Sequence, residues 1–151
     1  MPIDLDTLNG PQREAVLCTE GPLLVLAGAG SGKTRVLTHR IAHLVEDLNV
    51  APWQIMAITF TNKAAREMKE RVESMLGPLA ASVRISTIHS FCVRLLREDI
   101  QEIGYPRSFT IYDTDDSQRV MKAVYKDLNV DDKFLPIKAA INQMSRWKDQ
   151  L

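Results

Sequence analysis

The segment from Leu23 to Thr34, LLVLAGAGSGKT, constrains the fold of this chain more than any other. Five apolar residues form a run of strand length, three glycines follow within five positions, and helical periodicity begins after Lys33. A buried strand, a tight loop and a helix in this order are typical of α/β folds with a parallel sheet. We therefore predict a strand over 23–27 and a helix that starts near Lys33.

The glycine-rich loop predicts a phosphate-binding site. Its three glycines allow backbone angles that turn successive N–H groups toward phosphate oxygens, and the helix N-terminus adds positive potential. Lys33 can reach the terminal phosphates, and the Thr34 hydroxyl can ligate a Mg²⁺ ion that bridges them. The loop departs from the GxxxxGK[ST] pattern only at its first position, which is Ala27. The predicted phosphate-binding set is Ala27, Gly28, Ala29, Gly30, Ser31, Gly32, Lys33 and Thr34. A GxGxxG dinucleotide site is disfavoured, because Lys33 stands where the third glycine would be.

The rest of the chain alternates strands and helices up to about residue 106. Two further strands are predicted over 55–60 and 83–86, and helices over 7–17, 36–45, 64–76 and 92–100. The strands are apolar on both faces, which indicates a parallel sheet covered on both sides. After a short extended stretch at 110–112, Asp113 can cap a helix with a stripe at 120–128, and a second stripe runs over 137–144 behind Pro136. This change of pattern predicts a division into 1–106 and 107–151.

Composition limits the functional classes. The chain has 151 residues, 45% of them apolar, and its 19 basic and 19 acidic residues cancel, so net charge does not predict nucleic-acid binding. No apolar run reaches the roughly 20 residues that a membrane span needs, and the N-terminus has no signal pattern. Cys18 and Cys92 form no paired motif, which favours a reducing, cytoplasmic setting. His39 and His43 have metal-ligand spacing but no third ligand, so we interpret them as a solvated or packed helix face.

Three further segments narrow the choice among phosphate-loop proteins. They are LNGPQREAV at 8–16, AITFTNKAAREMKERV at 57–72 and ISTIHSFC at 85–92. Together with AGAGSGKTRVLTHRI at 27–41, they resemble the N-terminal part of UvrD/PcrA/Rep-type superfamily 1 DNA helicases, closest to PcrA and UvrD. The resemblance covers essentially the whole chain. It implies an α/β P-loop NTPase fold of the RecA-like type over 1–106, incomplete, and the start of a truncated helical inserted subdomain over 107–151.

The resemblance also implies residue roles. Gln12 would read the adenine edge, since a carboxamide can donate to and accept from adenine. Lys33 and Thr34 would serve ATP hydrolysis, and Arg35 would join the ATP site, although a structural ion pair is an equally good interpretation. The implied DNA-binding residues are Thr59, Phe60, Thr61, Asn62, Lys63, Thr87, His89 and Ser90.

Two aromatic residues carry alternatives. Phe60 could stack on a base, worth about 1–3 kcal/mol, whereas without the resemblance a core position would be its usual place. Trp147 could form a basic-aromatic surface with Arg146 and Lys148, but packing in a core is the better interpretation.

The function implied by the resemblance is an ATP-binding, N-terminal part of a 3′ to 5′ DNA helicase. Such an enzyme translocates on single-stranded DNA and unwinds duplex DNA in repair or replication, with ATP and Mg²⁺ as cofactors and the remaining helicase domains as partners. The chain has no apolar strand followed by Asp-Glu, since Glu98-Asp99 lies within a helical stripe, and it has no arginine fingers. We therefore expect little hydrolysis by the chain alone, and self-association could cover its sheet edge. The alternative is a non-catalytic module that binds a nucleotide or a partner.

Overall fold

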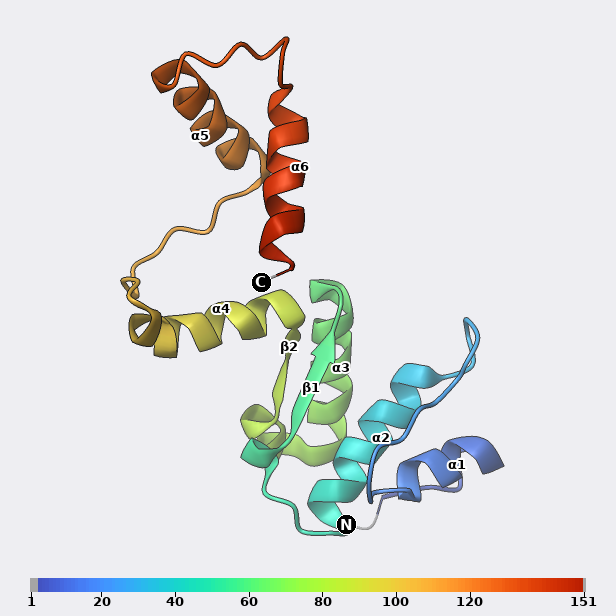
Figure 1. Ribbon diagram of the computed structural model, residues 1–151. Helices are drawn as coiled ribbons and strands as arrows, with labels where there is room; N and C mark the ends of the chain where they lie inside the picture. Colours follow the sequence, from blue (N-terminus) through green and yellow to red (C-terminus); the bar gives the residue numbers. More distant parts are fainter. Residues whose placement is uncertain (1–2, 151) are drawn as a thin grey trace. The chain divides into compact units, whose positions relative to one another are not determined.

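The computed structural model describes residues 3–150, which divide between Ile100 and Gln101 into two compact units (Figure 1). Among the described residues, the first unit contains two strands and four α-helices, and the second contains two α-helices. The helices and strands are α1 (Gly10–Leu17), α2 (Lys33–Glu46), β1 (Met56–Thr59), α3 (Asn62–Leu76), β2 (Arg84–Thr87), α4 (Ile88–Asp99), α5 (Thr114–Asp127) and α6 (Ile137–Lys148). Three short 3-10 segments are η1 (Pro52–Gln54), η2 (Gly77–Ser82) and η3 (Ile100–Ile103).

The sheet of the first unit consists of β1 and β2, which run parallel. Their register places Met56 opposite Arg84 and Thr59 opposite Thr87. Parallel strands need a crossover connection, and α3 supplies it, lying against both strands (Figure 1). The predictions of a strand near 55–60, a strand near 83–86 and a helix between them are confirmed.

The main core of the first unit lies between α2, α3 and the sheet. Helix α3 buries Met68, Val72 and Leu76, which recur every four residues and therefore form one face. The other buried members of this core are Ile41, Ala42, Val45, Ile55, Ala80 and Val83. The core thus fixes the phosphate-loop helix α2 against the strand–helix–strand unit.

The apolar composition of the strands predicted a sheet covered on both faces. In the described structure only one face is covered. Ala57 and Thr59 are half-buried, whereas Met56 and Ile58, on the opposite face of β1, are 51% and 38% exposed. Side chains alternate between the faces of a strand, and only the face toward α3 has a packing partner here.

The strand predicted over 23–27 is wrong for this structure. The segment has no strand geometry, and Leu24 and Leu26 are 82% and 87% exposed. A strand exists only where a neighbour takes its backbone N–H and C=O groups, and β1 and β2 pair with each other instead. The short strand expected at 110–112 is absent from the described structure for the same reason.

The second unit is a pair of packed helices. Helix α5 starts at a capping box formed by Asp113 and Asp116, which confirms Asp113 as the cap. Tyr125 is 8% exposed, and its hydroxyl donates to the Leu135 carbonyl at 2.9 Å, which ties the connection to α6. Trp147 is 59% exposed, near the C-terminal end of α6, so the expectation that it packs in a core is wrong.

The two units separate after Ile100, a few residues before the boundary predicted at 106. The assignment of the second unit to an inserted helicase subdomain stays a prediction.

Candidate functional site

The glycine-rich loop leads directly into α2. Gly30 and Gly32 have φ angles of 75° and 86°, in the left-handed region that favours glycine. Gly32 is the N-cap of α2 and gives it no side-chain hydrogen bond. The first-turn N–H groups of α2 therefore receive no side-chain cap, as an anion-binding helix terminus requires. Gly28 has no positive φ, so the expectation that it needs glycine's backbone freedom is wrong.

Donors in the loop converge on one carbonyl. Lys33 Nζ donates to the Gly28 carbonyl at 2.6 Å and to the Ala27 carbonyl at 3.0 Å. Ser31 donates to the same Gly28 carbonyl from Oγ at 2.7 Å and from its backbone N at 3.4 Å. A phosphate oxygen carries charge and is a stronger acceptor than a carbonyl. Lys33 and Ser31 could therefore exchange their hydrogen bonds to these carbonyls for hydrogen bonds to a phosphate.

The two residues that follow Lys33 differ in exposure. Thr34 lies half-buried in the first turn of α2, and Arg35 is exposed. Thr34 offers Mg²⁺ one hydroxyl, so phosphates and water would supply the other ligands, as is usual for this ion.

Gln12 links α1 to the loop. Its Oε1 accepts from the Asn9 backbone N at 3.1 Å, and its Nε2 donates to the Ser31 carbonyl at 2.9 Å. Its own backbone N donates to Asn9 Oδ1 at 3.0 Å, which completes a capping box. Sequence reasoning selected Gln12 but missed Asn9. The signal was present, because an N-cap residue followed three positions later by Gln is the pattern of a capping box.

Helix α1 is held firmly against α2. Leu8, Ala15 and Val16 form a small buried cluster with Val36 of α2. Arg40 of α2 donates from Nη1 to the Ala15 carbonyl at 2.7 Å and to the Cys18 carbonyl. These contacts place Gln12 beside the loop, so two segments distant in sequence build one site.

A cavity of about 280 Å³ lies where α1, the segment before the loop and the start of α2 meet. Its lining includes Asn9, Gln12, Ser31 and Lys33, with Val25 and Leu26 as apolar neighbours. A separate cavity of about 410 Å³ in the second unit, between α5 and α6, contains none of the predicted site residues. The first cavity is therefore the candidate nucleotide site.

The two segments predicted to contact DNA meet at one edge of the sheet. Thr59 and Thr87, the last residues of β1 and β2, lie opposite each other. Each strand leads into a helix that a threonine caps, since Thr61 Oγ1 accepts from Ala64 N at 3.1 Å and Thr87 Oγ1 accepts from Ser90 N at 3.2 Å. The parallel register thus brings the N-termini of α3 and α4 to the same edge (Figure 1).

Exposure separates the predicted DNA contacts into two groups. Phe60 is 94% exposed, which is not a core position. Asn62, Lys63, His89 and Ser90 are also exposed, although Lys63 Nζ lies 4.0 Å from the Glu67 carboxylate. Thr87 is only 6% exposed, and its hydroxyl lies 2.9 Å from Ser90 Oγ. Thr87 therefore caps α4 from a buried position, whereas the exposed residues are accessible to a ligand at this edge of the sheet.

The two histidines of α2 have separate partners. His39 Nδ1 lies 2.8 Å from the Arg35 carbonyl, and the buried His43 has its Nδ1 2.6 Å from Asp47 Oδ2. Over residues 3–150, no three His, Cys, Asp or Glu side chains gather in a way that could hold a metal ion. Within the same range, no helix combines the length and the apolar character that crossing a bilayer demands.

Comparison with known proteins identifies a family whose model matches nearly the whole chain. Residues 8–151 match the family model described as UvrD/REP helicase N-terminal domain. The chain is 58% identical over 147 residues to the ATP-dependent DNA helicase PcrA of Bacillus subtilis (strain 168), which covers 97% of the chain and 20% of the relative. It is 53% identical over 147 residues to the ATP-dependent DNA helicase PcrA of Staphylococcus aureus (strain Mu50 / ATCC 700699), with the same coverage. It is also 53% identical over 145 residues to the ATP-dependent DNA helicase PcrA of Leuconostoc citreum, which covers 95% of the chain and 19% of the relative. The chain spans about a fifth of the length of these relatives.

Proposed function

The chain belongs to the UvrD/REP helicase family, in its N-terminal domain, and from this membership we propose that it supplies the ATP-binding half-site of a DNA helicase. The parent protein would hydrolyse ATP with Mg²⁺ and move 3′ to 5′ along single-stranded DNA to unwind duplex DNA in repair or replication, in the cytoplasm. The relatives that match over nearly the whole chain carry the name ATP-dependent DNA helicase.

One observation carries the ATP proposal, namely the convergence of Gln12, Ser31 and Lys33 on a single cavity at the start of α2. The uncapped N-terminus of α2 and the ammonium group of Lys33 suit a polyphosphate, and the carboxamide of Gln12 suits a base that both donates and accepts. Apolar contacts from Val25 and Leu26 suit a flat ring.

Each residue would have a distinct task in ATP binding. Lys33 would leave the Ala27 and Gly28 carbonyls for the terminal phosphates and offset their charge. Thr34 would ligate the Mg²⁺ ion, which supplies charge stabilisation to the phosphoryl group when bound. The Asp-Glu pair and arginine fingers are not in this sequence, so we propose that the chain alone hydrolyses ATP poorly.

The DNA surface would be the sheet edge where β1 and β2 end. Phe60 is 94% exposed, so its ring is open to a base, and the exposed polar side chains of Asn62, Lys63 and His89 come from the starts of the helices that follow the two strands. Exposed backbone N–H groups at helix starts and polar side chains suit phosphate contacts without sequence preference. The other domains of the parent would cover the exposed apolar side chains of Leu24 and Ile58, and self-association would cover them in the chain alone.

The first test is equilibrium binding of a fluorescent ATP analogue to the chain, with and without Mg²⁺. We expect Mg²⁺-dependent binding that Lys33→Ala weakens about 10- to 100-fold, since charge-assisted hydrogen bonds contribute about 1.5–3 kcal/mol. Lys122→Ala, on α5 of the second unit, is the matched control and should leave affinity unchanged. Equal affinity of the Lys33 variant and the wild type would contradict the phosphate role of the loop.

A second measurement tests the DNA surface. Phe60→Ala should lower the affinity for a fluorescent single-stranded oligonucleotide about 5- to 100-fold, because base stacking contributes about 1–3 kcal/mol. Phe134→Ala is the matched control, since Phe134 is 89% exposed in the second unit. Thermal unfolding should be unchanged in both variants, because neither ring is buried. Unaltered oligonucleotide affinity in Phe60→Ala would overturn the proposed surface.

The competing function is a non-catalytic module that binds a nucleotide or a protein partner. The helicase names of the relatives over 95–97% of the chain do not favour it. A module of this kind would bind ATP with no change on adding single-stranded DNA. Coupling between the two ligands in one titration therefore separates the two functions.

A further inference from the structure

We propose that Asn9 is a positioning residue that fixes the orientation of the Gln12 carboxamide for adenine recognition, together with the carbonyl of Ser31. This inference rests on the proposed ATP site and adds to it a residue outside the phosphate loop. Asn9 touches Gln12 through two hydrogen bonds and lines the same cavity.

The orientation of the carboxamide follows from the chemistry of its two partners. The Asn9 backbone N–H can only donate, so the atom 3.1 Å from it must be the oxygen of Gln12. The Ser31 carbonyl can only accept, so the atom 2.9 Å from it must be the nitrogen. Rotating the amide by 180° would place its NH2 group against the Asn9 N–H donor and its oxygen against the Ser31 carbonyl acceptor. The two partners thus select one of the two amide orientations.

One donor and one acceptor of Gln12 are not used by these two bonds. A carboxamide nitrogen has two hydrogens and its oxygen has two lone pairs, so one of each is left for a ligand. Adenine presents a donor at N6 beside an acceptor at N7, and Gln pairs with both atoms at once. In the reversed orientation the amide would repel adenine at both positions. Holding the amide before binding also removes part of the entropy cost of ordering it.

Asn9 controls this arrangement through the start of α1. Its side-chain oxygen accepts from the Gln12 backbone N at 3.0 Å, which sets the distance between the two residues. The loop approaches from the other side, because a Cβ added to Gly32 would lie 2.7 Å from Gln12 Nε2. The carboxamide is therefore held between the N-cap of α1 and the N-cap of α2.

The experiment compares the affinities of the whole chain for Mg-ATP and for Mg-7-deaza-ATP, which lacks the N7 acceptor. We expect wild type to bind the deaza nucleotide about fivefold more weakly, the value of one hydrogen bond. Asn9→Ala should reduce this ratio to about twofold or less. It keeps the Asn9 backbone N–H but removes the side-chain oxygen that binds the Gln12 backbone N, so the first turn of α1 loosens and no longer holds that N–H against Gln12 Oε1. Asn9→Ser should restore the ratio, since Ser caps helices as well as Asn does.

Two further variants separate positioning from folding. Asn9→Gly removes the side-chain oxygen but costs a helix start only a few tenths of a kcal/mol, so it should reproduce the low ratio even if Asn9→Ala unfolds. Asp113→Ala removes the N-cap of the capping box at α5 in the second unit and should keep the wild-type ratio.

The outcomes distinguish the positioning role of Asn9 from the proposed ATP site on which it rests. Wild type that binds no Mg-ATP overturns the proposed ATP site, and the role of Asn9 with it. Wild type that binds Mg-ATP, with the full deaza penalty retained in Asn9→Gly, overturns the positioning role alone. A reduced ratio in both the Gly and Ala variants, with recovery in Asn9→Ser, supports it.

Discussion

Two helices in this chain begin with the same local device and use it differently. Helix α1 starts with the capping box of Asn9 and Gln12, and α5 starts with that of Asp113 and Asp116. In both, the N-cap side chain accepts from the backbone N three residues later, at 3.0 Å and 2.8 Å. In both, the second side chain returns to the N-cap backbone N, at 3.1 Å and 3.4 Å.

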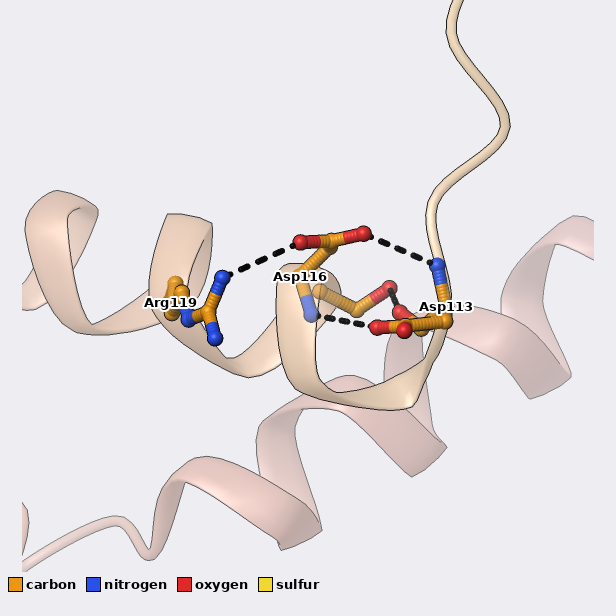
Figure 2. A network of polar contacts seen from close by, with 4 residues as sticks. Asp113, Asp116 and Arg119 are labelled. Carbon is orange, nitrogen blue, oxygen red and sulfur yellow. Dashed lines mark hydrogen bonds and ion pairs between the residues drawn. The ribbon is translucent and has the colours of Figure 1, made fainter.

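The third partner distinguishes the two boxes. Asp116 uses its other oxygen for Arg119, 3.4 Å away and one turn along the same helix, so the network closes on α5 itself (Figure 2). Gln12 uses its nitrogen for the carbonyl of Ser31, nineteen positions along the chain. A carboxylate has no hydrogen to donate to a carbonyl, whereas a carboxamide has two. The residue type therefore decides whether a helix start can also hold a distant loop.

Gly32→Ala should have the largest effect, because it disturbs the Gln12 side chain without substituting either residue of the α1 capping box. We expect ATP affinity to fall about 30- to 100-fold, because an L-residue at φ 86° costs about 1–2 kcal/mol and the new Cβ displaces Gln12 Nε2. Titration with the fluorescent ATP analogue measures this. Gly10→Ala is the matched control, since a Cβ there meets nothing within 4 Å and should leave affinity unchanged.

Substituting the second residue of each box sharpens the comparison. Gln12→Ala should weaken ATP binding about five- to tenfold, through the lost base contact and the loosened loop. Asp116→Ala should leave it unchanged, because Asp116 bonds only within the start of α5 among the contacts described. Isothermal titration of both variants checks this. Equal losses in the two would show that the boxes act only through general stability.

The smallest effects are expected at α5. Asp113→Ala should destabilise the second unit by about 1 kcal/mol, the usual cost of losing an N-cap. Arg119→Ala should cost less than about 0.5 kcal/mol, since its ion pair joins side chains that are 78% and 40% exposed. Hydrogen exchange of the α5 amides measures both. A larger loss for Arg119→Ala than for Asp113→Ala would contradict the dominance of the cap.

Elements with a local cause could be predicted from the sequence. The start of α2 at Lys33 follows from the glycines before it and the apolar periodicity after it. Helix α3 follows from the four-residue spacing of Met68, Val72 and Leu76, and the cap of α5 follows from Asp113. Each of these depends on neighbours within about one helical turn, which the sequence displays directly.

Elements that need a distant partner could not be predicted in the same way. Leu23 to Ala27 has strand composition, but no strand forms without a neighbour in register. Trp147 was expected in a core, yet it is 59% exposed, although Ile137, Ala140 and Ile141 earlier on α6 are half-buried. Apolar periodicity predicts which residues share a face, and packing decides whether that face is covered.

The sequence by itself determined the chemical inventory of this protein. It placed a lysine and a threonine after a glycine-rich loop, an aromatic residue after one strand, and a glutamine upstream, because these depend on residue type and spacing. Only the tertiary structure decided their relations. The parallel register set Thr59 opposite Thr87, and packing of α1 on α2 brought Gln12 to the Ser31 carbonyl. Both relations cross long stretches of chain, and their free energy comes from contacts that exist only after the chain has folded.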